Sequence, residues 1–144
     1  MRRMIMIALL SAPYAPPAFA APTLQPGLYD ISMQFVLKGM PIQLPVTRFQ
    51  QCVTAQDVAN GMAYASSENK DCTIRNLNQS GDQVVYEFNC ASQPGGPRMI
   101  GRANGISHAT GYDVMMEGRF DPAIEGMREF SQKLNARRLG DCSK

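Results

Sequence analysis

The sequence predicts a mainly β protein: a single antiparallel, strongly curved meander sheet of about six to seven strands, one short helix after Thr54, and two disulfides. Three observations predict this class. Apolar and polar residues alternate in short runs, turn-forming residues recur at regular intervals, and the 144-residue chain has 4 cysteines. Few apolar runs have helical spacing, so strands should dominate.

The N-terminal residues have the layout of a secretory signal peptide. Arg2 and Arg3 precede the apolar run 4–10, and a small-x-small sequence ends at Ala20. The apolar stretch is too short to span a bilayer. We therefore expect residues 1–20 to be removed by cleavage near Ala20, leaving a single disulfide-bonded domain, residues 21–144, that is periplasmic or secreted and has no transmembrane segment.

The charge balance changes when the signal peptide is removed. The whole chain has 14 Lys and Arg against 12 Asp and Glu, and Arg2 and Arg3 belong to the predicted signal peptide. The remaining domain is therefore formally neutral. A nucleic-acid-binding domain normally has a basic excess, so the composition predicts no nucleic-acid partner.

Two strands are predicted before the helix. Residues 29–35 alternate between apolar and polar side chains, and residues 38–41 supply a turn. Ile42, Leu44 and Val46 alternate with polar residues and predict a second strand that runs toward Cys52. The first two strands should therefore form a hairpin.

The helix signal begins at Thr54. A threonine is a good N-cap, and Asp57 would lie in the first turn, where a negative charge is favourable. The helix should end between Gly61 and Tyr64.

A β-hairpin is predicted from residue 72 to residue 90, around a loop at residues 80–82. This register places Cys72 opposite Cys90, and a shift by one residue would move the two cysteines to opposite faces. The same register gives three further pairs, Ile74 with Phe88, Arg75 with Glu87, and Leu77 with Val85. Cys72 should thus bond to Cys90, which leaves Cys52 for Cys142.

Two further strands are predicted at residues 98–108 and 112–120, after a loop at residues 94–97. We expect them to pair so that Ile106 faces Val114 and Ile100 faces Phe120. Glycines within these runs predict strong curvature or bulges, at Gly101, Gly105 and Gly118.

The segment 122–137 is compatible with either helix or strand. Asp121 and Pro122 are a good helix opening, whereas the alternation from Phe130 onward indicates a strand. The preferred interpretation is a short turn or helix at residues 122–129, then a strand from about Phe130 to Leu139. That strand would carry Cys142 back to Cys52.

Three short sequences together resemble a known family. They are Gln25-Pro26-Gly27-Leu28-Tyr29-Asp30-Ile31, Gln51-Cys52-Val53-Thr54 and Arg138-Leu139-Gly140-Asp141-Cys142. In this order they are similar to the domain-of-unknown-function 3617 (DUF3617) family of exported bacterial proteins, over essentially the whole mature chain. The resemblance implies a small, β-rich, periplasmic domain. It brings no established catalytic residue, ligand or activity.

No catalytic constellation is found in the sequence, so we expect a protein that is not an enzyme and needs no cofactor. His108 is the only histidine, and neither a Gly-x-Ser-x-Gly motif nor a phosphate-binding glycine loop is present. Asp113 and Glu117 would share one strand face, as isolated surface carboxylates commonly do. The cysteines lack the short spacing of a zinc site.

Two functional hypotheses follow, and a third is compatible with them. The first is a non-enzymatic module that binds a small hydrophobic ligand or an envelope partner, because adaptable methionines remain abundant in the mature domain. The alternative is periplasmic copper or other metal handling, with His108, Met115 and Met116 as soft ligands. Adjacent strand residues point to opposite faces, so Met115 and Met116 need a bulge to share one ion. The third is an envelope interaction protein that acts through its surface.

Overall fold

The computed structural model describes residues 24–40, 42, 44–65, 71–91 and 93–143. The predicted signal peptide and its cleavage point lie outside these residues. Within the described part of the chain, none of the helices has the length and apolar character needed to cross a membrane.

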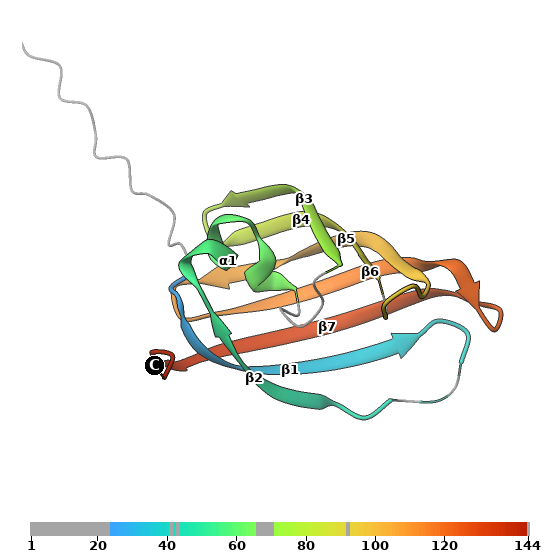
Figure 1. Cartoon of the computed structure of the whole chain (residues 1–144), viewed down its shortest axis with the longest axis horizontal. Helices are drawn as coiled ribbons and strands as arrows, with labels where there is room; N and C mark the ends of the chain where they lie inside the picture. The colour runs from blue at the N-terminus through green and yellow to red at the C-terminus, as the bar shows by residue number, and fades with distance from the viewer. Residues whose placement is uncertain (1–23, 41, 43, 66–70, 92, 144) are drawn as a thin grey trace, which may run out of the picture.

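Seven antiparallel strands form one sheet, as Figure 1 shows. Their bounds are β1 (Gly27–Leu37), β2 (Thr47–Val53), β3 (Cys72–Ser80), β4 (Gln83–Ala91), β5 (Arg98–His108), β6 (Gly111–Ile124) and β7 (Met127–Gly140). Two short helices, α1 (Ala55–Ala59) and η1 (Met62–Tyr64), lie between β2 and β3. The predicted fold class is confirmed.

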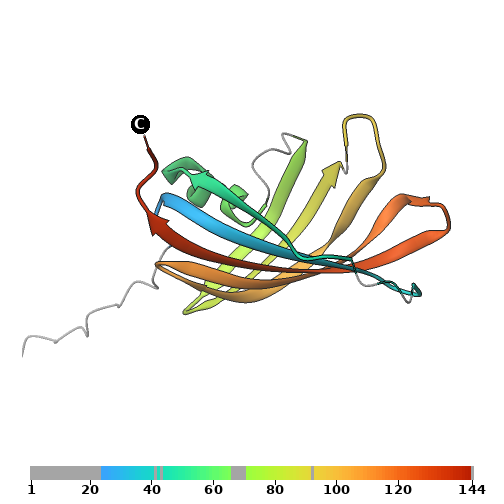
Figure 2. The same cartoon turned by 90° about the horizontal axis from the view of Figure 1, so that it is seen from below.

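The strand order is β2-β1-β7-β6-β5-β4-β3. Strands β3 to β7 form the predicted meander, and the β1–β2 hairpin then pairs through β1 with the last strand, β7. Strands β2 and β3 are therefore the two edges of the sheet. The connection through α1 and η1 runs from one edge to the other on the concave side, over one end of the sheet (Figure 2).

Helix α1 begins with a capping box, as the Thr54 signal predicts. Thr54 Oγ1 accepts a hydrogen bond from the Asp57 backbone N–H at 3.1 Å, and the Asp57 carboxylate accepts one from the Thr54 backbone N–H at 2.9 Å. These bonds satisfy two donors at the start of the helix. Gly61, with φ of 78°, then separates α1 from η1, because this left-handed conformation favours glycine.

The β3–β4 hairpin has the predicted register over its first half only. Cys72 pairs with Cys90, Ile74 with Phe88, and Arg75 with Glu87. The predicted pairing of Leu77 with Val85 is wrong, because a register shift after Arg75 places Asn78 opposite Val85. Asn76 has a φ of 52° at this bulge, and the turn shortens to the two residues 81–82.

The predicted register of β5 and β6 is wrong by one residue. Gly105 faces Val114 and Met99 faces Phe120, so Ile100 and Ile106 lie on the convex side. The reason is a two-residue turn at 109–110, which pairs His108 with Gly111. After Met99, the inward row of β5 consists of small residues, at Gly101, Ala103, Gly105 and Ser107.

Close backbone approach explains the glycines in this row. A Cβ atom on Gly101 would lie 2.1 Å from the Glu117 carbonyl oxygen, and one on Gly105 would lie 2.1 Å from the Asp113 carbonyl oxygen. No side chain fits at either position. The small inward row leaves space for large aromatic side chains on the neighbouring strands.

The predicted turn or helix at residues 122–129 is replaced by a hairpin. Strand β6 continues to Ile124, which pairs with Met127. Glu125 and Gly126 form the connection with φ values of 46° and 82°, and consecutive positive φ values are typical of a type I′ hairpin turn. The predicted strand from Phe130 to Leu139 is confirmed, as part of β7.

The second strand begins later than its apolar pattern predicts. Strand β2 starts at Thr47, so Ile42, Leu44 and Val46 lie in the connection that precedes it. All three are exposed, Ile42 at 59%. Their alternation with polar residues therefore does not reflect burial against the core.

The structure contains the disulfides Cys52–Cys142 and Cys72–Cys90, which are the two pairs that the sequence predicts. The first joins the end of β2 to the residues after β7, and the second joins β3 to β4. Disulfide bonds are consistent with an oxidising environment outside the cytosol.

Candidate functional site

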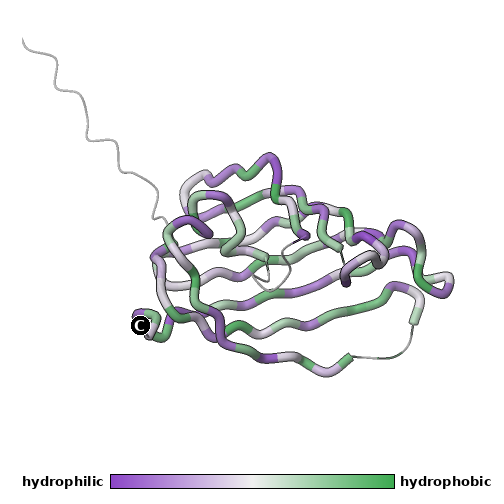
Figure 3. The backbone as a smooth tube through the Cα atoms, in the orientation of Figure 1, coloured by the Kyte–Doolittle hydropathy of each residue, from purple (hydrophilic) through white to green (hydrophobic). Residues whose placement is uncertain are grey.

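The concave face of the sheet holds most of the core. Apolar and polar residues are interleaved along the strands in Figure 3, so each strand turns one set of side chains inward. The inward side chains separate into two groups along the strands. One group is rich in tyrosine and lies under α1 and η1, and the other is rich in phenylalanine and lies at the opposite end.

The first group, here called the tyrosine end, comprises Tyr29, Tyr64, Tyr86, Tyr112 and Ser107, all buried. The ring of Tyr64, which η1 contributes, lies between two others. Its centroid is 5.6 Å from that of Tyr86 and 5.1 Å from that of Tyr112. The crossing connection therefore covers this end with a side chain of its own.

Hydrogen bonds fix the hydroxyl groups of the tyrosine end. Tyr29 donates to the Gln25 carbonyl at 2.6 Å, and Tyr86 donates to the Tyr64 carbonyl at 3.1 Å. The hydroxyls of Tyr64 and Ser107 are 2.8 Å apart. Burial raises the pKa of Tyr86 and of Tyr112 well above the ordinary tyrosine value. The hydroxyls at this end are thus held neutral.

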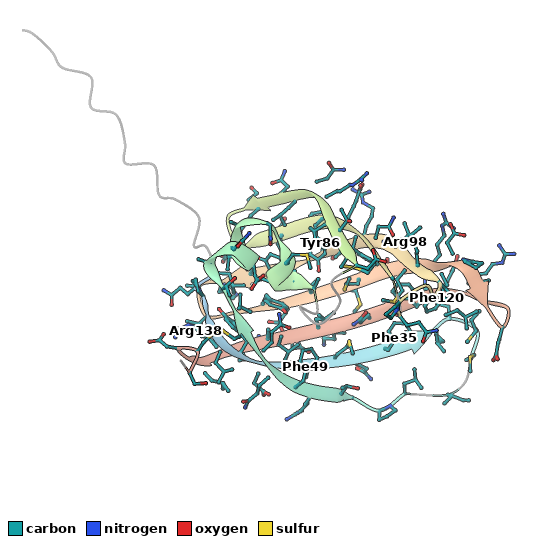
Figure 4. All side chains as sticks on the ribbon, in the orientation of Figure 1. Phe35, Phe49, Tyr86, Arg98, Phe120 and Arg138 are labelled. Atoms are coloured by element: carbon teal, nitrogen blue, oxygen red, sulfur yellow. A yellow bond between two sulfur atoms is a disulfide. The ribbon has the colours of Figure 1, made fainter. Side chains whose placement is uncertain are left out.

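The second group, here called the phenylalanine end, is a cluster of four rings, Phe35, Phe88, Phe120 and Phe130. Phe130 is fully buried at its centre, with ring centroids 5.1 Å from Phe35 and 5.0 Å from Phe120. Figure 4 shows Phe35 and Phe120 close together at the end of the sheet that is remote from α1. Aromatic contacts at these separations are favourable.

The phenylalanine end is only partly covered. Phe35, Leu37, Met99 and Ile124 are half-buried and pack against the fully buried cluster. The inward strand positions around them are apolar or small, apart from Gln132, whose side-chain amide donates to the Met33 sulfur. Among the described residues, none of the inward strand positions around Phe35 and Phe120 has a charged side chain. The result is an uncharged, partly open apolar surface.

The motifs that carry the family resemblance meet beside the tyrosine end. Arg138 Nε donates to the Pro26 carbonyl at 2.9 Å, and its side chain also pairs with Asp141 at 2.5 Å. A Cβ on Gly27 would lie 2.4 Å from the Gly140 carbonyl oxygen and 2.5 Å from Arg138 Nε. Together with the Cys52–Cys142 bond, these contacts join the start and end of the domain. The motif residues therefore have a structural role here.

The structure does not bring the candidate metal ligands together. Met115 is 40% exposed on the convex face, whereas Met116 is 6% exposed on the concave face. His108 pairs with Gly111 at the far end of β5, and its Nδ1 lies 3.7 Å from Asp82 Oδ1. Among the described residues, no group of three His, Cys, Asp or Glu side chains is placed to hold a metal ion.

The acidic pair on β6 lies on the convex face, and Asp113 is engaged there. Burial alone would raise the pKa of Asp113, but hydrogen bonds from Asn135 and Arg137 outweigh it and lower the pKa. Arg137 reaches Asp113 Oδ2 at 2.9 Å. The Asp113 carboxylate is thus stabilised in its ionised form, and Glu117 is exposed four residues along the strand.

Sequence reasoning missed the separation of tyrosine from phenylalanine. Both kinds occupy inward positions, but their neighbours across the sheet depend on register. One signal was available: the small residues at every second position from Gly101 to Ser107 mark the inward row of β5. Reading that row as inward would have given the correct pairing of β5 with β6.

Comparison with known proteins places the chain in a family and goes no further. None of the curated proteins and none of the solved structures matches it. One family model does match, over residues 24–142, which is nearly all of the predicted mature domain. The family resemblance carried by the three short motifs is therefore confirmed. The chain belongs to the family described as protein of unknown function (DUF3617).

Proposed function

We propose that this protein is a non-enzymatic binding module that holds a small hydrophobic ligand against the phenylalanine end of its concave face. One observation carries the proposal. Four phenylalanine rings form a continuous apolar cluster in which Phe35 is only partly buried, as are its neighbours Leu37, Met99 and Ile124, while α1 and η1 lie over the opposite end.

The side chains at this end favour an apolar, adaptable ligand. Phe35 offers one ring toward the uncovered side, and Met99 and Met116 add flexible thioethers that fit irregular shapes. The described inward positions provide no charge to orient a ligand. An acyl or isoprenoid chain satisfies these conditions, because its binding depends on apolar area rather than on directional contacts.

The proposal includes a location. The signal peptide expected at residues 1–20 and the two disulfides together support export to the periplasm. A protein in that compartment that shields an apolar chain from water needs no catalytic group. The absence of an enzymatic role is part of the proposal.

Fatty-acid binding by the purified protein tests this. Native mass spectrometry would first detect any copurified lipid, and titration with the fluorescent fatty acid cis-parinaric acid would then measure affinity. The Phe35→Ser variant should bind about tenfold or more weakly, since the apolar contact of one phenylalanine contributes about 1.5–3 kcal/mol.

Val36→Ser is the matched control. Val36 is the next residue on β1, points to the opposite face, and is 43% exposed. Its affinity should equal that of the unaltered protein. Equal loss in both variants, or a protein that binds neither a copurified lipid nor the probe, contradicts the proposal.

A further inference from the structure

The connection between β1 and β2 carries an exposed apolar segment that packing against the core does not explain. Among the described residues, ten large apolar side chains are exposed, and four of them lie within residues 40–46. The other six are distributed one per strand over β1 and β3 to β7. Single exposed apolar residues are common on protein surfaces, whereas a local concentration of them is typical of an interaction site. The four concentrated residues, here called the apolar connection, are Met40, Ile42, Leu44 and Val46.

The apolar connection adjoins the phenylalanine end. The Lys38 backbone N–H donates to the Glu129 carbonyl at 3.1 Å, and the Met40 backbone N–H donates to the Leu37 carbonyl at 3.3 Å. Leu37 is one of the half-buried residues that pack against the core at that end. Figure 1 shows the connection at the end of the sheet that is remote from α1. Apolar side chains therefore continue from the proposed ligand site to the exposed segment.

The backbone and side chains of this segment suit a bilayer better than a protein partner. Residues 44–46 have no regular secondary structure, and Pro45 has no N–H with which to pair with another strand. The exposed side chains are aliphatic or thioether, whereas the centres of protein interfaces are enriched in Trp, Tyr and Arg. The segment thus offers apolar area without directional contacts, and the interior of a bilayer requires only apolar area.

The charges around the apolar connection also fit a phospholipid surface. Lys38 precedes these residues and Arg48 follows them, with no Asp or Glu between the two. Long basic side chains can reach lipid phosphates while their stems stay in apolar surroundings. The neighbouring β6–β7 hairpin adds Glu125, Arg128 and Glu129, and Glu129 Oε2 lies 3.8 Å from Lys38 Nζ. These five charges nearly balance, so apolar contact rather than net charge should provide most of the attraction.

We propose that the apolar connection enters the surface of a phospholipid bilayer, so that an apolar ligand passes between the bilayer and the phenylalanine end. The ligand-transfer part rests on the proposed function. The bilayer contact does not, and the two can be measured separately. Ile42 and Val46 are the most exposed members, at 59% and 51%, so they should contribute most of the apolar area that the bilayer covers.

A tryptophan introduced at position 42 detects the contact directly, because the chain has no tryptophan of its own. The emission of I42W should move to shorter wavelength when phosphatidylcholine vesicles are added, and brominated phosphatidylcholine should quench it. I106W, at a position that is 47% exposed on the convex side of β5, is the control and should show neither change. An I42W emission that is neither shifted nor quenched overturns the proposal.

Replacing the two most exposed side chains measures their contribution. The affinity of I42S/V46S for phosphatidylcholine vesicles, measured by cosedimentation, should fall by about tenfold or more. V85S/I106S removes the same two residue types from exposed positions on β4 and β5, and should bind vesicles as the unaltered protein does. Equal loss in the two double variants overturns the proposal, because the position of the apolar residues would then be irrelevant.

Transfer of cis-parinaric acid separates this inference from the proposed function. In vesicle-free buffer, I42S/V46S should bind the probe as tightly as the unaltered protein. It should pass the probe to vesicles about tenfold more slowly, in proportion to the lost vesicle affinity. An unaltered protein that binds vesicles but not the probe would support the bilayer contact and overturn both the transfer and the proposed function.

Gel filtration tests the other occupant of this surface, a second copy of the chain. The unaltered protein and I42S/V46S should elute at the same position. A dimeric unaltered protein with a monomeric I42S/V46S would assign the apolar connection to contact between copies and overturn the proposal.

Discussion

The two ends of the concave face bury similar aromatic rings by different means. At the tyrosine end, each of three rings has a hydroxyl with a specific partner, and the connection between the sheet edges covers them. At the phenylalanine end, the rings pack against one another and have no hydroxyl to fix them, and Phe35 remains partly buried with Leu37, Met99 and Ile124. Hydrogen bonds are directional and costly to leave unmade, whereas apolar contacts are not directional. The first end is therefore fixed in shape, and the second is able to accept another molecule.

Each end also has one disulfide, and removing them should have the largest effect on stability. Cys52–Cys142 closes a loop with a sequence separation of 90 beside the tyrosine end, and Cys72–Cys90 closes one of 18 beside the phenylalanine end. By loop entropy, replacing the first pair with alanine should lower the free energy of unfolding by about 4–5 kcal/mol, and replacing the second by about 3 kcal/mol. Urea unfolding of the two double variants measures the difference. Equal losses would show that loop length does not determine which of the two disulfides contributes more to stability.

Alkaline pH should weaken the tyrosine end selectively. The pKa values of Tyr86 and Tyr112 are raised in the folded state, while those in the unfolded chain are about 10. Above pH 10 the unfolded chain releases these protons and the folded protein retains them, so stability falls as the pH rises. Each tyrosine should contribute a loss of about 1.4 kcal/mol per pH unit in that window.

The Tyr112→Phe variant isolates one of these contributions. It removes the titrating hydroxyl and keeps the ring. Between pH 9 and pH 11, this variant should lose about 1.4 kcal/mol less of its free energy of unfolding than the unaltered protein, as measured by urea unfolding. Val85→Ala, on the convex face, serves as the control and should keep the full slope. An unchanged slope in Tyr112→Phe would rule out this explanation.

The smallest expected effect concerns the cover of the tyrosine end. Thr54→Ala removes the capping box of α1 and should cost about 1 kcal/mol. Amide hydrogen exchange should become faster in α1 and η1, with no change in the strands around Phe120. Thr47→Ala, at the exposed start of β2, is the control and should leave exchange in α1 unaltered. Uniform acceleration over the whole chain would mean that the cap acts on global stability instead.

Features determined by neighbouring residues could be predicted from the sequence. The Thr54 cap depends on residues three apart, and the register of Cys72 with Cys90 depends on a single short hairpin. The position of β1 beside β7 could not be predicted in this way, since it joins residues at opposite ends of the domain.

The wrong predictions share a physical cause. Ile106 was expected inward because it is apolar, yet it is 47% exposed while Gly105 faces the core. Tertiary packing placed a small residue where a large one has no space. Likewise, Asp121 and Pro122 indicate a helix locally, but β6 continues past them, and its pairing with β7 resumes at Ile124 and Met127 to close a hairpin. The concave site depends on these registers, so the sequence predicted neither its residues nor its two ends.

The pairing of β1 with β7 also affects the order in which the strands of the domain can pair during folding. Leu28 pairs with Gly140, so the first strand to be synthesised finds its inner partner only when the last strand is present. Strands β3 to β7 are consecutive hairpins and form from near neighbours in the chain, whereas this seam must close a very long loop. We expect a chain that lacks β7 to leave β1 and β2 without a sheet to join. The incorporation of β1 and β2 into the sheet thus depends on the last strand of the chain.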